Sequence, residues 1–337
     1  MAHLNNQFTK ALAAIEPDST DKTNAPLAHE RVREVLERDD QLREYGADTI
    51  LIGSYKRSVS IKRMKDVDVF TRLADIPSDV EAQDLLDHVF TVLNTEFGKD
   101  ADGHRRTKRQ DRSVQVSFPE YDLYVDAVPA RPTNRTDGAW EIPQRGDSNA
   151  WVATNPDKLT SLTTAMNSTH DGSYVRTVKL MRQIRRNLLN KGSKPGGFFI
   201  EIATHNAFSS GGVSGTDNAE YFVSALEAVS TILDEHVWFG TPLPDPTMDN
   251  ASIAVRATPD EFETIRTQFA SAAINARDAL NDDDPGTAAV AFRKLLGKDP
   301  DGQWLFEMPP GYNEDGSKKA SIEPGSKDVP GGSRRYG

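Results

Sequence analysis

The chain has 337 residues, no cysteine and a formal net charge of −11. The lack of cysteine excludes disulfides and zinc–thiolate sites, and the acidic balance argues against constitutive nucleic-acid binding, which depends on neutralising phosphates with lysine and arginine. No run approaches 18 apolar residues, which excludes a membrane-spanning helix, and residues 1–20 lack the basic flank and apolar core of a secretion signal. We therefore expect a cytoplasmic protein without membrane association.

The first half of the sequence predicts a small lobe that mixes helices and strands. Apolar residues recur at helical spacing in two segments, and they alternate with polar residues in four shorter ones. In chain order the expected elements are a helix at 27–45, strands at 49–52 and 66–73, a helix at 80–97, a charged loop at 99–112 and a hairpin of 114–118 with 121–128.

The second half predicts a helical lobe. Residues 131–156 are typical of a loop, and helical periodicity dominates from there to about residue 296. The expected helices are 171–190, 197–208, 217–236, 259–280 and 286–296. From about Pro309 glycine, proline, serine and charged residues replace the apolar ones, which is typical of a flexible tail. The fold class is therefore α+β in two lobes, divided as 1–150, 151–308 and a tail at 309–337.

Two aspartates on the second expected strand are the main candidates for chemistry. Asp66 and Asp68 follow Gly53-Ser54 after eleven intervening residues. Residues two apart on a strand project from the same face, about 6–7 Å apart along the chain. That spacing suits two divalent cations about 3.5–4 Å apart in a phosphoryl-transfer site. Mg²⁺ prefers such carboxylates together with phosphate oxygens, so we expect two Mg²⁺ or Mn²⁺ ions.

A third carboxylate is expected on the neighbouring strand, near the attacking hydroxyl. Asp126 lies between two apolar residues of that strand, and Asp122 is the alternative. Gly53 and Ser54 suit a phosphate-binding turn, because glycine admits close backbone approach and the serine hydroxyl can donate a hydrogen bond. An isolated Asp-x-Asp or Gly-Ser is common by chance in so acidic a chain; the ordered combination with strand-like spacing favours a catalytic role.

The expected helix at 171–190 carries a basic stripe on one face and apolar residues on the other. A basic stripe is often only a solvated face. In an acidic protein that must hold a triphosphate, it is equally a candidate for binding phosphate. Lys179, next to the apolar face, is the best single candidate in the stripe, and Arg182 lies one turn further along.

The segments GSYKRSVSIKRMKDVDVF and DLYVDAVPA resemble the signature of the DNA polymerase β-like nucleotidyltransferase superfamily. Within it, YVRTVKLMRQ, PGGFFIEIATHNAF and PDPTMDN are similar to segments of the CD-NTases, the cyclic GMP-AMP synthase-like enzymes of CBASS anti-phage systems. The resemblance covers roughly residues 30–295. It implies a bilobal enzyme with its active site in the cleft between the lobes, which joins nucleoside triphosphates into a cyclic di- or trinucleotide.

The resemblance also implies roles for individual residues. The three metal ligands correspond to Asp66, Asp68 and Asp126, the phosphate turn to Gly53 and Ser54, and the lysine that contacts the triphosphate to Lys179. Phe198 stands where the family often has a base-stacking aromatic, although packing in the core beside its apolar neighbours is an equal alternative. The family often has Arg-Gly-Thr after the phosphate turn, where this chain has arginine, serine and valine at 57–59.

The implied partners are NTP substrates, among them ATP, and a downstream effector that binds the cyclic nucleotide. Conjugation through Gly337 is a further implied possibility, with an inert tail as its alternative. Two other functions remain open: a non-cyclising nucleotidyltransferase that modifies RNA, a small molecule or a protein, and a nucleotide sensor that keeps the fold without turnover.

Overall fold

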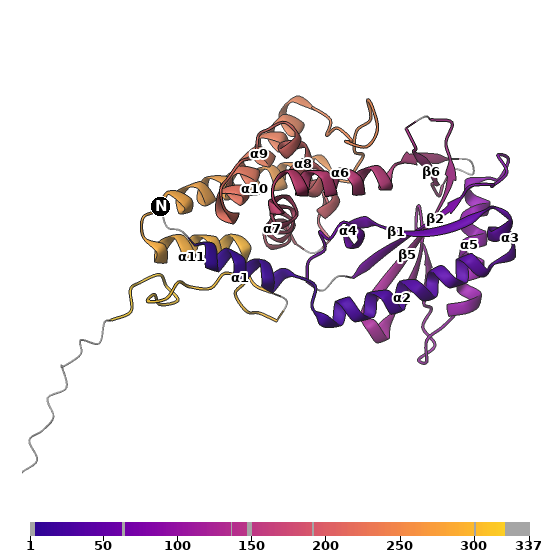
Figure 1. Cartoon of the computed structure of the whole chain (residues 1–337), viewed down its shortest axis with the longest axis horizontal. Coiled ribbons are helices and arrows are strands. Elements are labelled where there is room, and N and C mark those ends of the chain that lie inside the picture. The colour runs from indigo at the N-terminus through magenta and orange to yellow at the C-terminus, as the bar shows by residue number, and fades with distance from the viewer. Residues whose placement is uncertain are drawn as a thin grey trace, which may run out of the picture.

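The computed structural model describes residues 4–62, 65–135, 137–146, 150–190, 192–299 and 301–320. The strands gather at one end of the elongated molecule and most of the long helices at the other (Figure 1). The structure thus confirms the expected α+β architecture, with a mixed sheet followed by helices. Within the described part of the chain, no helix combines the length and apolar character needed to cross a bilayer.

Seven strands form one sheet with the order β1-β2-β5-β4-β3, and β6 and β7 extend it from the end of β5. Only β2 and β5 run parallel among the strand pairs of the described residues. The strands are β1 (Ala47–Ile52), β2 (Asp66–Leu73), β3 (Thr107–Arg109), β4 (Val114–Phe118), β5 (Leu123–Pro132), β6 (Trp140–Pro143) and β7 (Trp151–Thr154).

One face of the sheet is covered by α2 (Ser19–Arg38) and α5 (Ala82–Phe97), because alternate strand residues are apolar on that side. Val67, Val69 and Val125 are fully buried in this core. The short helices of this region are α3 (Asp40–Glu44), α4 (Gly53–Lys56) and the 3₁₀ turn η1 (Pro119–Tyr121). Residues between the buried positions therefore face the opposite side, toward the helical part.

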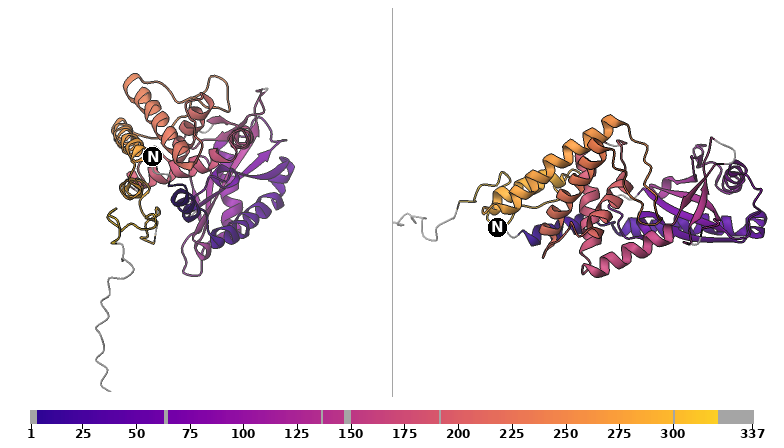
Figure 2. Two further views of the ribbon diagram at one scale, coloured as in Figure 1. Left: turned by 60° about the vertical axis from the view of Figure 1, so that its left-hand side comes forward. Right: turned by 90° about the horizontal axis from the view of Figure 1, so that it is seen from above.

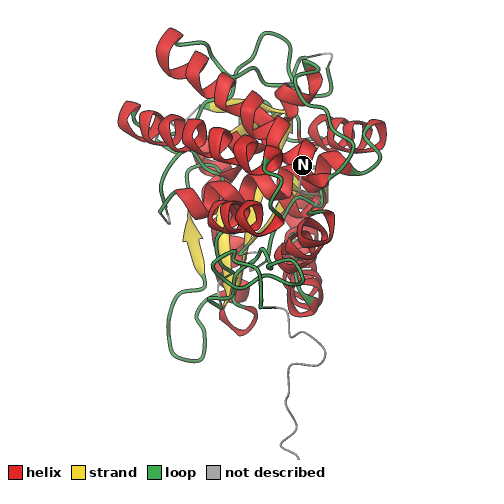
Figure 3. Ribbon diagram, turned by 90° about the vertical axis from the view of Figure 1, so that its left-hand side faces the viewer, coloured by secondary structure: helices red, strands yellow, loops and turns green. Residues whose placement is uncertain are grey.

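The helical part has its own core, and the N-terminal helix belongs to it. Helix α1 (Asn5–Ile15) packs with the long helices although it precedes the sheet in sequence (Figure 2). Seen from the helical end, helices lie in front and most of the strands behind them (Figure 3). The other helices are α6 (Pro156–Thr169), α7 (Ser173–Leu188), α8 (Gly197–Ser209), α9 (Asn218–Phe239), α10 (Pro259–Asn281) and α11 (Pro285–Leu296). The proposed division at residue 150 therefore leaves α1 in contact with the second lobe.

The structure differs from the expected elements chiefly between 131 and 170. The expected loop at 131–156 contains the hairpin of β6 and β7, and α6 follows it. The residues of this hairpin do not alternate between apolar and polar, because the contacts that hold it are polar and aromatic. Arg131 donates to Glu141 at 2.9 Å and its guanidinium lies 3.8 Å from the centre of the Trp151 ring. The expected loop at 99–112 likewise contains the short β3.

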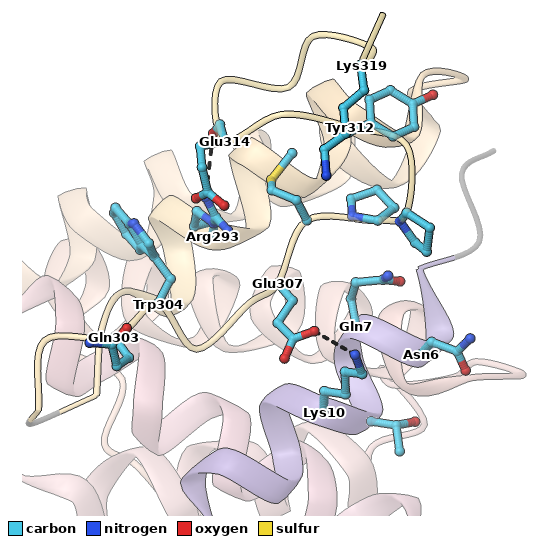
Figure 4. A pocket seen from close by; sticks show the side chains of 14 residues that line it. Asn6, Gln7, Lys10, Arg293, Gln303, Trp304, Glu307, Tyr312, Glu314 and Lys319 are labelled. Atoms are coloured by element: carbon cyan, nitrogen blue, oxygen red, sulfur yellow. Dashed lines mark hydrogen bonds and ion pairs between the residues drawn. The ribbon is translucent and has the colours of Figure 1, made fainter. Parts of the chain in front are cut away.

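Residues 309–320, expected in a flexible tail, pack along α11 (Figure 4). Tyr312 donates its hydroxyl hydrogen to Asp284 at 3.0 Å, and Arg293 pairs with Glu314. Gly286 makes room for this segment, since a Cβ there would lie 2.2 Å from the Tyr312 ring. Side-chain polar contacts rather than apolar periodicity order the segment. Residues 321–337, with Gly337, lie outside the described residues.

The packing of α1 predicts that Phe8→Ala destabilises the helical core. Phe8 is fully buried, with the rings of Phe292 and Phe306 about 5 Å away. Truncating such a phenylalanine costs about 3–5 kcal/mol, which lowers the urea midpoint measured by circular dichroism. Phe239→Ala is the matched control, because that side chain is 78% exposed. Equal midpoints for the two variants would contradict the assignment of α1 to this core.

Candidate active site

The three predicted aspartates lie on the two parallel strands at the centre of the sheet. Asp68 on β2 is the direct partner of Asp126 on β5, and Asp66 lies two residues before Asp68 on the same strand. Val67 and Val69 are buried in the core beneath α2 and α5. The opposite face of β2, which carries Asp66 and Asp68, is therefore turned toward the helical part. Asp122, the alternative to Asp126, precedes β5 in a turn and pairs with Lys65 at the surface.

Burial raises the pKa of all three carboxyl groups, and repulsion between carboxylates adds to the rise for Asp68 and Asp126. Burial is the main cause for Asp68, whose pKa rises to about 7, and the charges of Asp126 and Asp66 add to the effect. Burial and the charge of Asp66 raise the pKa of Asp126 to about 6, against an opposing hydrogen bond from Gln115 at 3.2 Å. Burial also raises the pKa of Asp66. Clustered oxygen ligands with too little positive charge among them fit a divalent cation.

Gly53 lies against Asp68 at the end of β1. Its φ of +73° is a conformation that favours glycine, and a Cβ there would lie 1.9 Å from Asp68 Oδ2. The Ser54 hydroxyl is 3.0 Å from the Ser60 hydroxyl. Ser58 stands where the resembling family often has glycine, and it adopts the left-handed conformation with a φ of +59°. The departure at 57–59 therefore keeps a glycine-like backbone at that position.

A cavity of about 440 Å³ opens between the sheet and the helices at this point. Gly53, Ser54, Asp66 and Asp68 line it from the sheet. The helical part and the connecting segment contribute Asn155, Pro156, Leu159, Arg182, Gly197, Phe198, Glu201, Ile202, Asp245 and Thr247. Asp126 is not part of this lining. The cavity joins the phosphate turn, two of the carboxylates and an exposed aromatic ring.

A buried carboxylate holds two arginines at the floor of the cavity. Glu201 on α8 has a side chain only 1% exposed and accepts from Arg57 Nε at 2.6 Å and from Arg182 Nη1 at 3.2 Å. Arg57 follows the phosphate turn and Arg182 comes from α7, so Glu201 ties the two parts of the molecule together. Glu201 and Arg57 were not predicted as site residues. A single acid within the apolar run FFIEIA was the available signal.

The two predicted phosphate-binding cations of α7 lie in different surroundings. Arg182 lines the cavity, whereas Lys179 does not; its ammonium is buried and paired with Glu16. Arg186 of the same helix is exposed and donates to the backbone of Lys62 at 3.1 Å. Lys179 would have to leave Glu16 in order to reach a phosphate, and its role stays a prediction.

Phe198 is available for stacking. Its side chain is 45% exposed and lines the cavity, whereas the next two residues of α8, Phe199 and Ile200, are buried. The alternative of core packing for Phe198 is therefore wrong, because the helix turns the neighbouring side chains inward instead. Stacking on a base remains a prediction.

Among the described residues, one group of three ligand-bearing side chains has all its ligand atoms within 4.8 Å of one another; it lies away from the cavity and is not the set Asp66, Asp68 and Asp126. The group is Asp100, Asp102 and His104, on the loop before β3. Asp100 accepts the backbone N–H groups of Asp102 and His104, which accounts for the cluster as a turn. None of these residues lines the cavity beside Asp66.

Comparison with known proteins gives one family. Residues 1–167 match the family described as the Second Messenger Oligonucleotide or Dinucleotide Synthetase domain. A cyclic AMP-AMP-AMP synthase of Acinetobacter sp. is 29% identical over 304 residues, covering 86% of this chain and 83% of that protein.

Two solved structures share the fold. E. coli MS115-1 CdnC with ATP has a TM-score of 0.67 at 18% identity and covers 91% of this chain and 100% of its own. Bradyrhizobium diazoefficiens CdnG with GTP has a TM-score of 0.66 at 14% identity and covers 87% of this chain and 97% of its own. Because the sequence identities are low, this structural likeness establishes the fold alone, which is the polymerase β-like nucleotidyltransferase fold.

The raised pKa of Asp68 predicts that the metal-free protein loses stability as pH rises. Between about pH 4 and 7 the unfolded chain releases a proton that folded Asp68 retains, so the free energy of unfolding falls across that window. Asp68→Asn removes this penalty. At pH 8 we expect it to be more stable than the wild type by up to about 4 kcal/mol, at about 1.4 kcal/mol per pKa unit.

The measurement is urea unfolding from pH 4 to pH 8 in the presence of a chelator. Asp122→Asn is the matched control, because that side chain is 81% exposed. The advantage of Asp68→Asn should grow up to pH 7 and then level off. An advantage that is absent at pH 8, or shared by the control, contradicts the electrostatic account.

Proposed function

We propose that the chain is a CD-NTase, a nucleotidyltransferase of the family that synthesises cyclic oligonucleotides in CBASS anti-phage defence, and that it cyclises ATP-containing NTPs at Asp66, Asp68 and Asp126. The observation that carries the proposal is the facing pair Asp68 and Asp126 with Asp66 beside them, at a glycine turn and a cavity.

Divalent metal dependence belongs to the family, and we propose two Mg²⁺ or Mn²⁺ ions here. The residues that would hold them are the three aspartates, because their clustered charge is relieved by a cation. Such ions supply charge stabilisation for the attacking oxygen and for the departing pyrophosphate. We propose that Asp126, the strand partner of Asp68, takes the proton of the attacking hydroxyl.

The reaction forms a bond from a ribose hydroxyl oxygen to the α-phosphorus and breaks the bond from that phosphorus to pyrophosphate. Backbone at Gly53, the Ser54 hydroxyl and the Arg182 guanidinium lie where the triphosphate would be held. Glu201 orients Arg182 and Arg57 through its two ion pairs. Phe198 presents its ring for stacking on a base.

We propose ATP as a substrate and a cyclic trinucleotide as the product. The support is the cyclic AMP-AMP-AMP synthase relative, together with CdnC, whose structure contains ATP. A downstream effector would bind the product, and the site of action would be the cytoplasm. Conjugation through Gly337 remains a proposal about a residue outside the described range.

The proposal is tested by incubating the purified chain with Mg²⁺ or Mn²⁺ and all four NTPs, followed by mass spectrometry. We expect a phosphatase-resistant cyclic product that contains adenine, and none from Asp66→Asn combined with Asp68→Asn. Labelled nucleotide appearing only on added RNA or on the protein would instead support the non-cyclising alternative. Binding of NTP without release of pyrophosphate would support the sensor.

The close approach of Gly53 to Asp68 predicts a matched pair of glycine variants. Gly53→Ala forces the Asp68 carboxylate away, since the added Cβ would meet Oδ2 at 1.9 Å. Displacing a reacting group by about 1 Å can reduce turnover by about 100-fold. Gly211→Ala shares the positive φ, at +75°, but meets no atom within 4 Å.

We therefore expect pyrophosphate release to fall by about 100-fold for Gly53→Ala, while Gly211→Ala loses about 1 kcal/mol of stability and keeps its turnover. Equal turnover for the two variants would show that the Gly53 contact does not matter to the reaction.

A further inference from the structure

An exposed pair of aromatic side chains ends helix α9. Trp238 is 60% exposed and Phe239 is 78% exposed, the highest value among the exposed large hydrophobic side chains of the described residues. The helix end that carries them is held in place, since the Thr241 N–H donates to Glu235 O at 3.2 Å and His236 Nδ1 lies 2.8 Å from Thr241 O. Two aromatic rings in fixed positions on a surface are typical of a binding site.

The charged groups around the two rings are mainly acidic. Glu235 lies one turn before the rings on the same face of α9, and within the described chain its carboxylate has no ion-pair partner. Arg266 of α10 lies over the Trp238 ring, 4.7 Å from its centre. The charge of Arg266 is balanced by Asp234 at 3.1 Å and by Glu263 at 2.5 Å. The exposed aromatic pair therefore lies in a surface of net negative charge.

The acidic surroundings restrict the kind of occupant. A second copy related by a two-fold axis would bring Glu235 of each chain against the same acidic surface of the other, and like charges oppose such a contact. A membrane surface of anionic lipids is repelled for the same reason. The rings and the carboxylates together fit a segment that carries an aromatic side chain and positive charge.

One segment outside the described residues has this composition. Residues 333–337 read SRRYG, with two arginines directly before a tyrosine and no acidic side chain. Arginine and tyrosine are also the residues that contribute most often to binding at protein surfaces. The chain itself thus contains a segment complementary to the exposed aromatic pair of α9.

The length of the chain allows this segment to reach the rings of its own molecule. Residues 309–320 pack where α10 meets α11, with Tyr312 bonded to Asp284 at 3.0 Å. From that end to Arg266, α10 extends for about 23 Å. Between residue 320 and Arg334, an extended chain reaches about 46 Å. The reach exceeds the distance along α10 by about a factor of two.

We propose that residues 333–337 dock on the exposed aromatic pair of α9 in the same chain. Tyr336 packs against the two rings, and the two preceding arginines pair with Glu235 and its acidic neighbours. This interaction goes beyond the proposed cyclase reaction and does not depend on it. Docking holds Gly337 against the helical part, so a reaction at Gly337 first requires release of the segment.

Photo-crosslinking of the full chain tests the proposal. p-Benzoylphenylalanine replaces Tyr336, the protein is irradiated at low micromolar concentration, and mass spectrometry identifies the crosslinked peptides. We expect crosslinks within one chain, to the end of α9 or the start of α10. In the variant Trp238→Ala/Phe239→Ala their yield should fall about 10-fold, as expected for the loss of two aromatic contacts. Both side chains are exposed, so the fold should persist.

Exchange of charges gives a second readout. Arg334→Glu/Arg335→Glu and Glu235→Lys should each lower the yield about 2–5-fold, as expected for exposed ion pairs. Combining these changes should raise the yield above that of Arg334→Glu/Arg335→Glu alone, because the reversed charges attract each other again. Glu34→Lys is the matched control, an exposed acid on α2 that should leave the yield unchanged.

Four results would overturn the proposal. Crosslinks scattered over the surface, or a yield that the aromatic and charge variants leave unchanged, mean that residues 333–337 do not dock here. Crosslinks between chains, detected in a mixture of ¹⁵N-labelled and unlabelled protein, assign the surface to a second copy. Flotation with phosphatidylglycerol vesicles that Trp238→Ala/Phe239→Ala abolishes assigns it to a lipid surface. The cyclase reaction is measured separately as pyrophosphate release, so its failure and the failure of docking are distinguishable.

Discussion

The arrangement of the candidate active site depends on the repulsion among carboxylates on one parallel pair of strands. Asp68 and Asp126 face each other across β2 and β5, and burial keeps water from screening them. The apolar residues on the reverse of these strands, packed under α2 and α5, hold the carboxylates in place. The fold thus keeps an arrangement of carboxylates that is electrostatically unfavourable by itself, and we propose that bound cations relieve it. Functional sites commonly lower the stability of the fold in this way.

The neighbouring features follow from this arrangement. Gly53 has no side chain because Asp68 occupies that space, and Ser58 adopts a glycine-like backbone so that the turn keeps its shape. Glu201 gathers positive charge next to the carboxylates, because its one buried carboxylate pairs with Arg57 and Arg182 from the two parts of the molecule. Positive charge thereby lies beside the carboxylates, where we propose that the triphosphate binds.

Prediction from sequence succeeded where the signal was periodic. The strand at Asp66–Leu73 and the helix at Gly197–Ser209 follow apolar spacing closely. It failed where contacts are long-range and polar. Nothing local indicates that Lys179 pairs with Glu16, 163 positions away, or that Arg57 meets Glu201, 144 positions away. The β6–β7 hairpin and residues 309–320 depend on the same kind of contact, so composition alone suggested loop and tail.

The most direct test of the central claim is a crystal structure with Mn²⁺ and a non-reactive ATP analogue, using anomalous scattering to locate the metal. The account predicts two anomalous peaks between Asp66, Asp68 and Asp126, with the triphosphate at Gly53. Peaks only at Asp100, Asp102 and His104, with Asp126 turned away from Asp68, would contradict it.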